Sequence, residues 1–397
     1  MPRSSISVPT DWERSGLPGW TYFSQPLFEV EKNQIFRTHW QYACHVSEVT
    51  EVGQYVTFDI ADERALVICG KDGVVRAFHN LCRHRGSRIV GDEKGQCNKA
   101  LVCPYHGWAY NLDGTLRGVA AANTFPPMNP EEWGLKTIEM EIWHGFIFIR
   151  FQPGPQPAMA EILARFEEEV APYKPEDMVI DEGSYATDTA DVNWKSVRDV
   201  DNEGYHVRQA HPGLHDLYGA KYFDEPYVDG ASRSIGYFNE APSKGWSTRH
   251  YRAILPEARH LPKESQKAWL YVGVFPNLVF GFYPDSMVFY QEIPHSATKT
   301  VQRGAVFKYR NEDRRTRAAR YLSQRIDRDT AKEDQMLTIW SCEATKSSAF
   351  DGIIFSDLEY GLKTFHDHLR KVVPVMNLTT EPTQLASENQ TLLVAAE

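Results

Sequence analysis

Two short loops carry the residue types that bind metal through sulfur and nitrogen. The first reads Cys82-Arg-His84-Arg-Gly86 and the second reads Cys103-Pro-Tyr-His106-Gly-Trp. Two thiolates and two imidazoles could bind a zinc ion tetrahedrally. They could also bind a [2Fe–2S] cluster with Cys on one iron and His on the other. Because neutral imidazoles replace two thiolates, such a cluster is a mid-potential electron donor.

The distribution of ligands between the loops separates these two interpretations. Zinc knuckles usually pair Cys with Cys in one knuckle and often carry two spaced His in the other. Here each loop supplies one Cys and one His, the arrangement that a Rieske centre needs. Each loop also has a glycine close to its His, which lets the backbone approach the sulfides. Of the other cysteines, Cys44, Cys69 and Cys342 are expected in the core, and Cys97 is expected as an unliganded loop thiol.

A second candidate metal site lies in the segment 193–212, which is rich in carboxylates. His206 and His211 could supply two ligands of a 2-His-1-carboxylate triad, which leaves open positions on Fe(II) for O2 and substrate. Five residues turn an α-helix about 140° beyond one full turn, so the two imidazoles cannot share one face of a regular helix. Pro212 also disfavours the α conformation at His211. We therefore expect the helix to end or to be distorted between them, for example by a π-type bulge.

The elements that position these ligands differ on either side of the Pro/Gly stretch at 153–157. Before it, residues 42–152 have β texture, and Asp72-Gly73 forms a hairpin turn. After it, helical and strand patterns mix. The expected helices are 28–40, 158–171, 194–210, 312–343 and a last one capped by Ser356 and Glu359, and the expected strands are 55–60, 65–69, 142–151, 269–275, 278–283, 286–293 and 299–309.

Composition limits the class of protein. The chain has 397 residues, 42% of them hydrophobic, which is enough for two or three domains with buried cores. A net charge of −10 makes nucleic acid an unexpected partner. No apolar run is long enough to span a bilayer, and the N-terminus lacks the apolar stretch of a signal peptide. We expect a cytoplasmic protein, in which six cysteines are not a disulfide framework.

The two cluster loops resemble those of the oxygenase (alpha) subunits of Rieske non-haem iron oxygenases. The resemblance runs from about residue 20 to 372. It implies an α+β fold, with an all-β Rieske domain followed by a catalytic domain whose antiparallel sheet is flanked by helices, of the helix-grip or START-like type. The expected parts are a lead-in segment at 1–41 that packs on the catalytic domain, the Rieske domain at 42–153, the catalytic domain at 154–377, and a mobile polar tail at 378–397.

By the same resemblance, specific residues receive roles. Cys82 and Cys103 would bind the buried iron of the cluster, and His84 and His106 the outer iron. The segment around His206 and His211 is similar to the family's E/D-x2-H-x4-H motif, in which both histidines bind the mononuclear iron. Glu203 takes the acidic position of that motif. A glutamate there resembles the subgroup that acts on quaternary ammonium compounds such as glycine betaine and carnitine, although Val207 stands where that subgroup often has Cys.

The third iron ligand must be a carboxylate from another element. The resemblance implies an Asp on the long C-terminal helix, where Asp329, Glu333 and Asp334 are candidates. Periodicity does not decide among them, because the apolar stripe of that helix lies nearer to Glu333 than to Asp334. The family pattern of Asp followed by an amide residue favours Asp334. The stripe consists of Leu322, Ile326, Leu337 and Trp340.

The resemblance also implies partners and a reaction. A flavin- or ferredoxin-type reductase would pass NAD(P)H electrons to the cluster, and the mononuclear iron would use O2 to oxidise a small molecule. A cyclic homotrimer would bring one chain's cluster beside the next chain's iron, a ring built from one heterologous interface. Glu203 would then accept hydrogen bonds from His106 of one chain and from an iron-bound His of the next.

Several substrates fit the sequence. Aromatic rings could form a cation–π cage for a trimethylammonium group or stack on an aromatic substrate. The first hypothesis is monooxygenation of a C–H bond, with N-demethylation of a betaine-like amine as one outcome, and the alternative is aromatic-ring hydroxylation. Outside the enzymes, an electron-transfer Rieske protein and a zinc-stabilised binding module compete. The aromatic residues available for a pocket are Tyr205, Trp269, Tyr271, Phe280, Phe282 and Tyr290.

Overall fold

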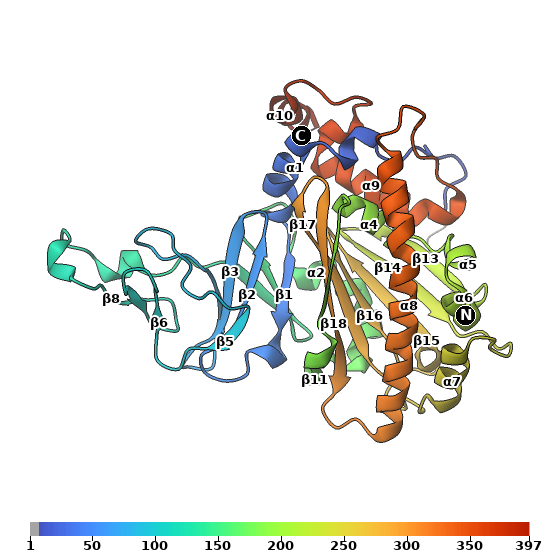
Figure 1. The fold of residues 1–397 in the computed structure, drawn as a ribbon, viewed down its shortest axis with the longest axis horizontal. Coiled ribbons are helices and arrows are strands. Elements are labelled where there is room, and N and C mark those ends of the chain that lie inside the picture. Colours follow the sequence, from blue (N-terminus) through green and yellow to red (C-terminus); the bar gives the residue numbers. More distant parts are fainter. Residues whose placement is uncertain (1–7, 397) are drawn as a thin grey trace. The chain divides into compact units, whose positions relative to one another are not determined.

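Two sets of segments pack separately in the computed structural model, which describes residues 8–396 (Figure 1). The smaller unit comprises Phe36–Glu161 and Pro175–Ile180. The larger unit comprises the N-terminal residues up to Ile35, Ile162–Lys174 and the chain from Asp181 onward. Residues 1–7, which begin the expected lead-in segment, lie outside the described residues. Among the described residues, no helix combines the length and the apolar character needed to cross a bilayer.

Short antiparallel sheets build the smaller unit. The strand orders are β1-β10-β9, β4-β3-β2-β5 and β6-β7-β8. The turn at Asp72-Gly73 is confirmed, with Gly73 at a φ of +76°. The bounds are β1 (Gln41–His45), β2 (Gln54–Ile60), β3 (Glu63–Cys69), β4 (Val75–His79), β5 (Lys94–Gln96), β6 (Leu101–Val102), β7 (Ala109–Tyr110), β8 (Leu116–Gly118), β9 (Glu139–Trp143) and β10 (Phe146–Arg150).

The expected single strand at 142–151 is wrong. His144 and Gly145 both have positive φ, 47° and 83°, and they form the turn of a hairpin between β9 and β10. The run looked continuous because β10 is buried at every position, so its apolar residues do not alternate with polar ones. Only the His-Gly pair marked the turn, since glycine adopts positive φ at no steric cost.

One antiparallel sheet forms the frame of the larger unit. Its strands follow the order β12-β18-β17-β16-β15-β14-β13. The four expected strands between 269 and 309 are confirmed as β15 to β18, whereas β12 to β14 were not expected. Their bounds are β12 (Ala186–Ala190), β13 (Tyr222–Val228), β14 (Ala231–Tyr237), β15 (Ala268–Val274), β16 (Leu278–Phe282), β17 (Met287–Ser296) and β18 (Lys299–Tyr309).

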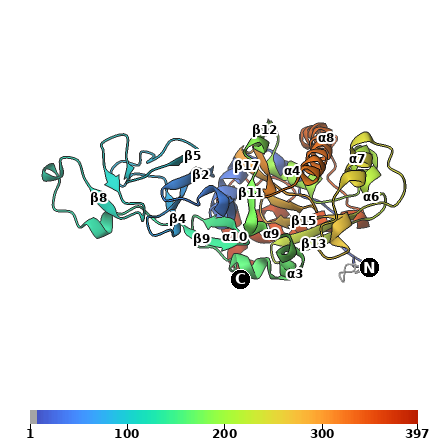
Figure 2. The same cartoon turned by 90° about the horizontal axis from the view of Figure 1, so that it is seen from below.

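The long helix α8 (Arg314–Ala344) runs across one face of this sheet, as Figures 1 and 2 show. Its N-terminus is capped by Asp313, whose side chain accepts a hydrogen bond from the Thr316 N–H. Three shorter helices pack against α8. They are α4 (Trp194–Asp201), α6 (Pro212–Tyr218) and α7 (Trp246–Ile254). The expected helix at 312–343 is confirmed, and it covers the part of the sheet where the candidate ligands gather.

Other expected helices are shorter or broken. The helix expected at 194–210 divides into α4 and the four-residue α5 (Val207–Ala210). The segment 158–171 consists of brief α and 3-10 turns, among them α2 (Met159–Ile162) and α3 (Glu167–Val170). The lead-in helix begins earlier than expected, as α1 (Gln25–Glu31), and continues as a π-helical turn over Lys32–Phe36.

The C-terminal region differs from the expected mobile tail. The capping box of Ser356 and Glu359 is confirmed and precedes α9 (Tyr360–Val372). Beyond it, α10 (Leu385–Ala396) is ordered into a helix. Its buried Asn389 accepts a hydrogen bond from the Val375 N–H, and this polar contact was invisible in a segment read as polar and mobile.

Candidate metal centres

The first candidate cluster loop is shaped by its backbone. It follows β4, and the N–H of Gly86 donates to the carbonyl of Cys82 at 2.9 Å. The Cys82 N–H in turn donates to the carbonyl of Ser87 at 2.7 Å. Gly86 has a φ of +73°, which a residue with a Cβ adopts at a cost. The loop therefore closes on itself and presents the side chains at its tip.

The second loop, between β6 and β7, has the same hydrogen-bond frame. The Gly107 N–H donates to the carbonyl of Cys103 at 3.0 Å, and the Cys103 N–H donates to that of Trp108 at 2.8 Å. Gly107 also has a φ of +73°. The frames differ only in the position of the imidazole, which is two residues after Cys82 in the first loop and three after Cys103 in the second.

These loops bring the four predicted cluster residues together in one patch. Cys82 and Cys103 are buried, whereas His84 is half-buried and His106 is exposed. The two imidazole rings lie 4.6 Å apart between centroids, and His84 stacks on Trp108. The Nδ1 atom of His84 is buried without a hydrogen-bond partner. Two inner sulfurs, two outer imidazoles and an unsatisfied ring nitrogen fit a [2Fe–2S] cluster with Cys on its inner iron.

The surroundings shift the pKa values of the Cys82 and Cys103 thiols in opposite directions. Burial raises the pKa of Cys82, against hydrogen bonds that act in the other direction. Burial also acts to raise the pKa of Cys103, but hydrogen bonds from the backbone N–H groups of Tyr105 and His106 outweigh it, and the pKa lies below its usual value. Backbone donors aimed at sulfur favour thiolate, the form that binds iron.

The second candidate centre begins where helix α4 ends. The chain turns at Gly204, whose N–H donates to Asp224 on β13 at 2.7 Å. A Cβ at Gly204 would lie 2.2 Å from the Tyr222 ring, so only glycine fits here. His206 then precedes α5, and His211 separates α5 from α6 with φ −117° and ψ 81°. The expectation that no regular helix carries both histidines is confirmed. Asp224 was missed, because nothing in β13 marks it.

Potential ligand atoms of His206, His211 and Asp334, the last on α8, lie close together. The Nε2 atoms of His206 and His211 lie 2.9 Å apart. Asp334 Oδ1 lies 2.9 Å from the Nε2 of His211 and 3.5 Å from that of His206. All three ligand atoms are within 4.8 Å of one another, an arrangement that could hold a metal ion. Asp334 Oδ1 is buried and faces both Nε2 atoms, which fits a carboxylate oxygen that shares a cation with them.

A carboxylate binds the outer nitrogen of each histidine. Glu203 Oε1 lies 2.5 Å from His206 Nδ1, and Glu333 Oε2 lies 2.9 Å from His211 Nδ1. Such partners place the ring N–H on Nδ1 and leave Nε2 free to bind metal. Glu333, considered as a third ligand or a solvated residue, instead contacts the back of His211. Asp329 is exposed.

The electrostatics of the triad are those of a site built for positive charge. Burial acts to lower the pKa of His206, but hydrogen bonds to Asp334 and Glu203 raise it to about 10. Burial acts to raise the pKa of Asp334, but hydrogen bonds from His206 and His211 hold it below the usual value. These pKa shifts favour a protonated His206 beside an ionised Asp334, and a divalent cation would displace that proton.

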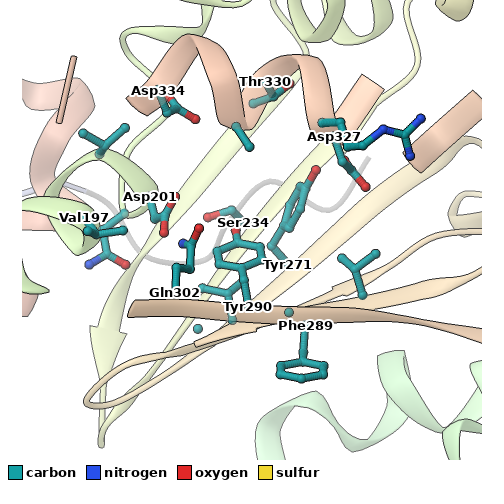
Figure 3. A pocket seen from close by; sticks show the side chains of 18 of the residues that line it. Val197, Asp201, Ser234, Tyr271, Phe289, Tyr290, Gln302, Asp327, Thr330 and Asp334 are labelled. Atoms are coloured by element: carbon teal, nitrogen blue, oxygen red, sulfur yellow. The ribbon is translucent and has the colours of Figure 1, made fainter. Parts of the chain in front are cut away.

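A cavity of about 570 Å³ opens beside the triad, between α8 and the sheet (Figure 3). Tyr271 and Tyr290 line it, as the sequence suggested. Tyr205 is 57% exposed and lies outside it. The other three aromatic candidates are buried away from the cavity, and several tyrosines that were not considered line it. The former are Trp269, Phe280 and Phe282, and the latter are Tyr185, Tyr222, Tyr227 and Tyr283.

Two family models match the chain. Residues 39–137 match the model described as the Rieske [2Fe-2S] domain. Residues 169–374 match the one described as the ring hydroxylating alpha subunit (catalytic domain). The cluster loops fall within the first match, and the triad falls within the second.

Named relatives match about half of the chain. The glycine betaine monooxygenase oxygenase subunit of Pseudomonas aeruginosa (strain UCBPP-PA14) is 39% identical over 198 residues, 50% of this chain and 45% of that protein. The carnitine monooxygenase oxygenase subunit of Escherichia coli (strain K12) is 32% identical over 200 residues, 50% of this chain and 53% of that protein. The matches thus cover about half the length of these curated relatives.

Solved structures share the fold over nearly the whole chain. The quaternary ammonium Rieske monooxygenase CntA, in complex with an inhibitor, has a TM-score of 0.76 at 22% identity, covering 90% of this chain and 95% of that one. Naphthalene 1,2-dioxygenase from Rhodococcus sp. has a TM-score of 0.72 at 19% identity, with 92% and 95% covered. The expected α+β fold, an all-β domain and a larger catalytic domain, is confirmed. The chain belongs to the ring-hydroxylating alpha subunits, the Rieske oxygenase family whose members carry a [2Fe–2S] cluster and a mononuclear iron.

Proposed function

We propose that this protein is the oxygenase component of a multicomponent Rieske oxygenase. In this proposal Cys82, His84, Cys103 and His106 hold the [2Fe–2S] cluster, and His206, His211 and Asp334 hold Fe(II). The observation that carries it is the convergence of two Nε2 atoms and one carboxylate oxygen within 4.8 Å, beside a cavity of substrate size. A triad of this kind leaves positions open for O2 and substrate, which is the chemistry an iron ion supplies when bound.

The protein's own residues would arrange that chemistry. Glu203 and Glu333 orient the two imidazoles, so that Nε2 of each faces the ion. Tyr271 and Tyr290 supply apolar ring surface with hydroxyl groups along the wall of the cavity in which a substrate would bind. One oxygen atom of O2 would enter a C–H bond of the substrate and the other would leave as water, consuming two electrons delivered through a flavin- or ferredoxin-type reductase and two protons from solvent.

The proposed substrate is a betaine-like quaternary amine. The support comes from relatives named for glycine betaine and carnitine, and from tyrosine-rich walls that suit a cationic head group. Hydroxylation of an N-methyl group would yield a carbinol that releases formaldehyde and the demethylated amine. A second candidate is ring hydroxylation, because the alpha subunit of 2-aminobenzenesulfonate 2,3-dioxygenase from Alcaligenes sp. is 31% identical over 188 residues, 47% of this chain and 47% of that protein.

The experiment is a reconstituted turnover with both metals loaded, NADH and a surrogate reductase. Betaines, carnitine and aromatic acids are tested in parallel, and NADH and O2 consumption are compared with formaldehyde and hydroxylated product. We expect product from an N-methylated cation in proportion to O2. Uncoupled O2 consumption with every substrate would contradict the proposal. Product from an aromatic acid alone would select the second candidate. His211→Ala, which removes a proposed iron ligand but leaves the cluster, is the control.

The proposal includes a cyclic homotrimer in which Glu203 links two chains. Its carboxylate holds His206 Nδ1, and we propose that it also accepts a hydrogen bond from the exposed His106 of a neighbouring chain. Glu203→Gln should keep both metals and strongly slow product formation. The matched variant Glu333→Gln, at the other imidazole, should not slow reoxidation of the reduced cluster when it is loaded to the same iron content. Equal rates of cluster reoxidation by O2 and substrate in Glu203→Gln and the unaltered protein would reject the link.

We also propose a cytoplasmic location. All six cysteines are free thiols. Five of them are buried, and two of these five, Cys82 and Cys103, belong to the proposed cluster site; this pattern suits a reducing compartment. Fractionation of the source cells with compartment markers tests this directly. Recovery of the protein with periplasmic or membrane markers would contradict it.

A further inference from the structure

Asp201 is a carboxylate of the cavity that the proposed chemistry does not use. It is the last residue of α4 and lines the cavity together with His206 and Asp334. Figure 3 shows Asp201 and Asp334 toward one end of the cavity, with Asp327 toward the other. The Asp201 side chain is 17% exposed, and its Oδ2 atom is buried without a hydrogen-bond partner. A buried carboxylate oxygen without a donor is costly, so this position calls for one.

The neighbouring guanidinium does not satisfy Asp201. The Nη1 atom of Arg198 is 3.8 Å from Asp201 Oδ2, which is too far for a hydrogen bond. The hydrogen bonds of Arg198 go elsewhere, from Nη2 to Asn202 at 2.6 Å and to Tyr227 at 2.9 Å. The fully buried Glu292 places its Oε2 atom 3.8 Å from Arg198 Nε. The single guanidinium of Arg198 therefore faces two carboxylates, Asp201 and Glu292. With both ionised, one of their two negative charges has no cationic partner there.

The metal centre does not supply the missing charge. An Fe(II) ion brings two positive charges, but Asp334, Glu203 and Glu333 already surround its histidines. Burial, and after it the charge of Glu292, raises the pKa of Asp201 well above its usual value. A cation beside Asp201 would offset the cost of burying this carboxylate and favour its ionised form.

Aromatic surface adjoins the same carboxylate. Tyr290 lines the same cavity as Asp201, and Figure 3 shows both side chains there. Burial, and after it the charge of Asp201, raises the pKa of Tyr290 well above its usual value, so the phenol stays neutral. Tyr290 lies on the cavity side of β17, where its cross-strand partner on β16 is Val279, which also lines the cavity. Neutral tyrosine rings beside a carboxylate suit a cationic nitrogen whose substituents are methyl or methylene groups.

We infer that Asp201 determines specificity for a positively charged nitrogen, which its carboxylate receives beside Tyr290, so that carbon atoms attached to that nitrogen face the end of the cavity at His206, His211 and Asp334. This inference rests on the proposed function and names the residue that selects charge. Quaternary and protonated tertiary amines share the required chemistry. A tertiary ammonium group would also donate an N–H hydrogen bond to Oδ2, whereas a quaternary one would offer charge alone.

The test measures binding, without turnover. The metal-loaded protein is titrated under argon with choline, with protonated N,N-dimethylethanolamine, and with 3,3-dimethylbutan-1-ol, the neutral isostere of choline. The variants are Asp201→Asn and Asp201→Glu. Asp188→Asn, which removes an exposed carboxylate at the cavity wall, is the matched control. Iron content and the reduced-cluster resonance signal are recorded for each protein, so that loss of a metal is seen separately.

We expect the unaltered protein to bind the cations more tightly than the neutral alcohol, and Asp201→Asn to weaken cation binding roughly 10- to 100-fold while the alcohol is unaffected. Asp188→Asn should bind like the unaltered protein, and Asp201→Glu should recover part of the affinity. Equal binding of cation and alcohol by the unaltered protein would overturn the inference even if Asp201→Asn failed to fold. Equal loss for cation and alcohol in the variant would also overturn it. Cation-selective binding without any oxidised amine would leave this inference standing and reject the proposed function.

Discussion

The cluster loops and the triad are both candidate metal centres, but different interactions hold their ligands in position. Backbone hydrogen bonds within six consecutive residues shape each loop, and a glycine at φ +73° closes it. The triad has no such local frame. His206, His211 and Asp334 come from separate elements, and side-chain carboxylates hold the two imidazoles. Local frames tolerate change elsewhere in the chain, whereas a centre assembled from distant side chains depends on every element that carries one.

The largest expected effect is the separate loss of each centre. Cys103→Ser should remove the [2Fe–2S] cluster and its resonance signal, while His211→Ala should remove the mononuclear iron and leave the cluster, because the ligand sets share no residue. Iron per chain should fall from about three to about one in the first variant and to about two in the second. Cys97→Ser is the control and should keep all iron. Loss of both centres in either variant would mean that the two regions do not fold independently.

Within the triad, adjacent residues of α8 should differ sharply. Asp334→Asn should abolish iron binding, since its oxygen approaches both Nε2 atoms. Glu333→Gln should weaken it only about 10- to 100-fold, because an amide still accepts the Nδ1 hydrogen bond of His211. Metal titration of the two variants, followed by Fe(II) content at equilibrium, measures the difference. The opposite ranking would assign the third ligand to Glu333.

The backbone frame of the cluster loop can be tested with two glycines. Gly86 and Gly73 have φ of +73° and +76°, and a Cβ would meet open space at each. Alanine at either position should therefore cost about 1–2 kcal/mol of backbone strain. Only Gly86→Ala should also shift the reduction potential or speed cluster loss, measured by redox titration and by bleaching of the cluster absorbance. Identical cluster behaviour in the two variants would show that the frame does not tune the centre.

The smallest effect concerns pH. Burial raises the pKa of Asp327 from 3.8 to about 8, although Tyr283 donates a hydrogen bond to it. The folded protein then holds a proton that the unfolded chain releases near pH 4, so this group's stabilisation is present at low pH and is lost as pH rises through about 8. Asp327→Asn stays neutral, so its thermal midpoint should rise relative to the unaltered protein between about pH 4 and 8. A constant difference between the two proteins would show that Asp327 is ionised throughout.

The sequence was most informative where the structure is local. The cluster loops were visible because ligands, glycines and hydrogen bonds all fall within six residues. The break between His206 and His211 followed from helix geometry and from Pro212. Strands β15 to β18 alternated or ran apolar between clear turns, and their expected positions are confirmed. In each case the physical cause lies inside the segment that carries the signal.

The remaining features depend on contacts between distant segments. Asp334 and Glu333 are neighbours, and only the positions of two histidines on other elements separate their environments. The apolar stripe of α8 also misled, because Trp340 is 57% exposed. The first half of α8 packs on the core through Leu322 and Ile326, whereas its second half covers the cavity, so apolar spacing no longer reports burial there. Asp224 and the cavity tyrosines had no signal for the same reason.

Helix α8 also places cavity-lining residues at regular intervals along the cavity. Asp327, Thr330, Asp334 and Thr338 all line it, and successive members of this row are about 4.5 to 6 Å apart along the helix axis. Each step away from Asp334 is therefore a known distance from the triad. A bulky or charged side chain introduced at Thr330 would limit the space to about one helical turn from the triad, and one at Asp327 would limit it to about two. The length of the molecule that the cavity accepts can thus be changed by a substitution at a chosen position of α8.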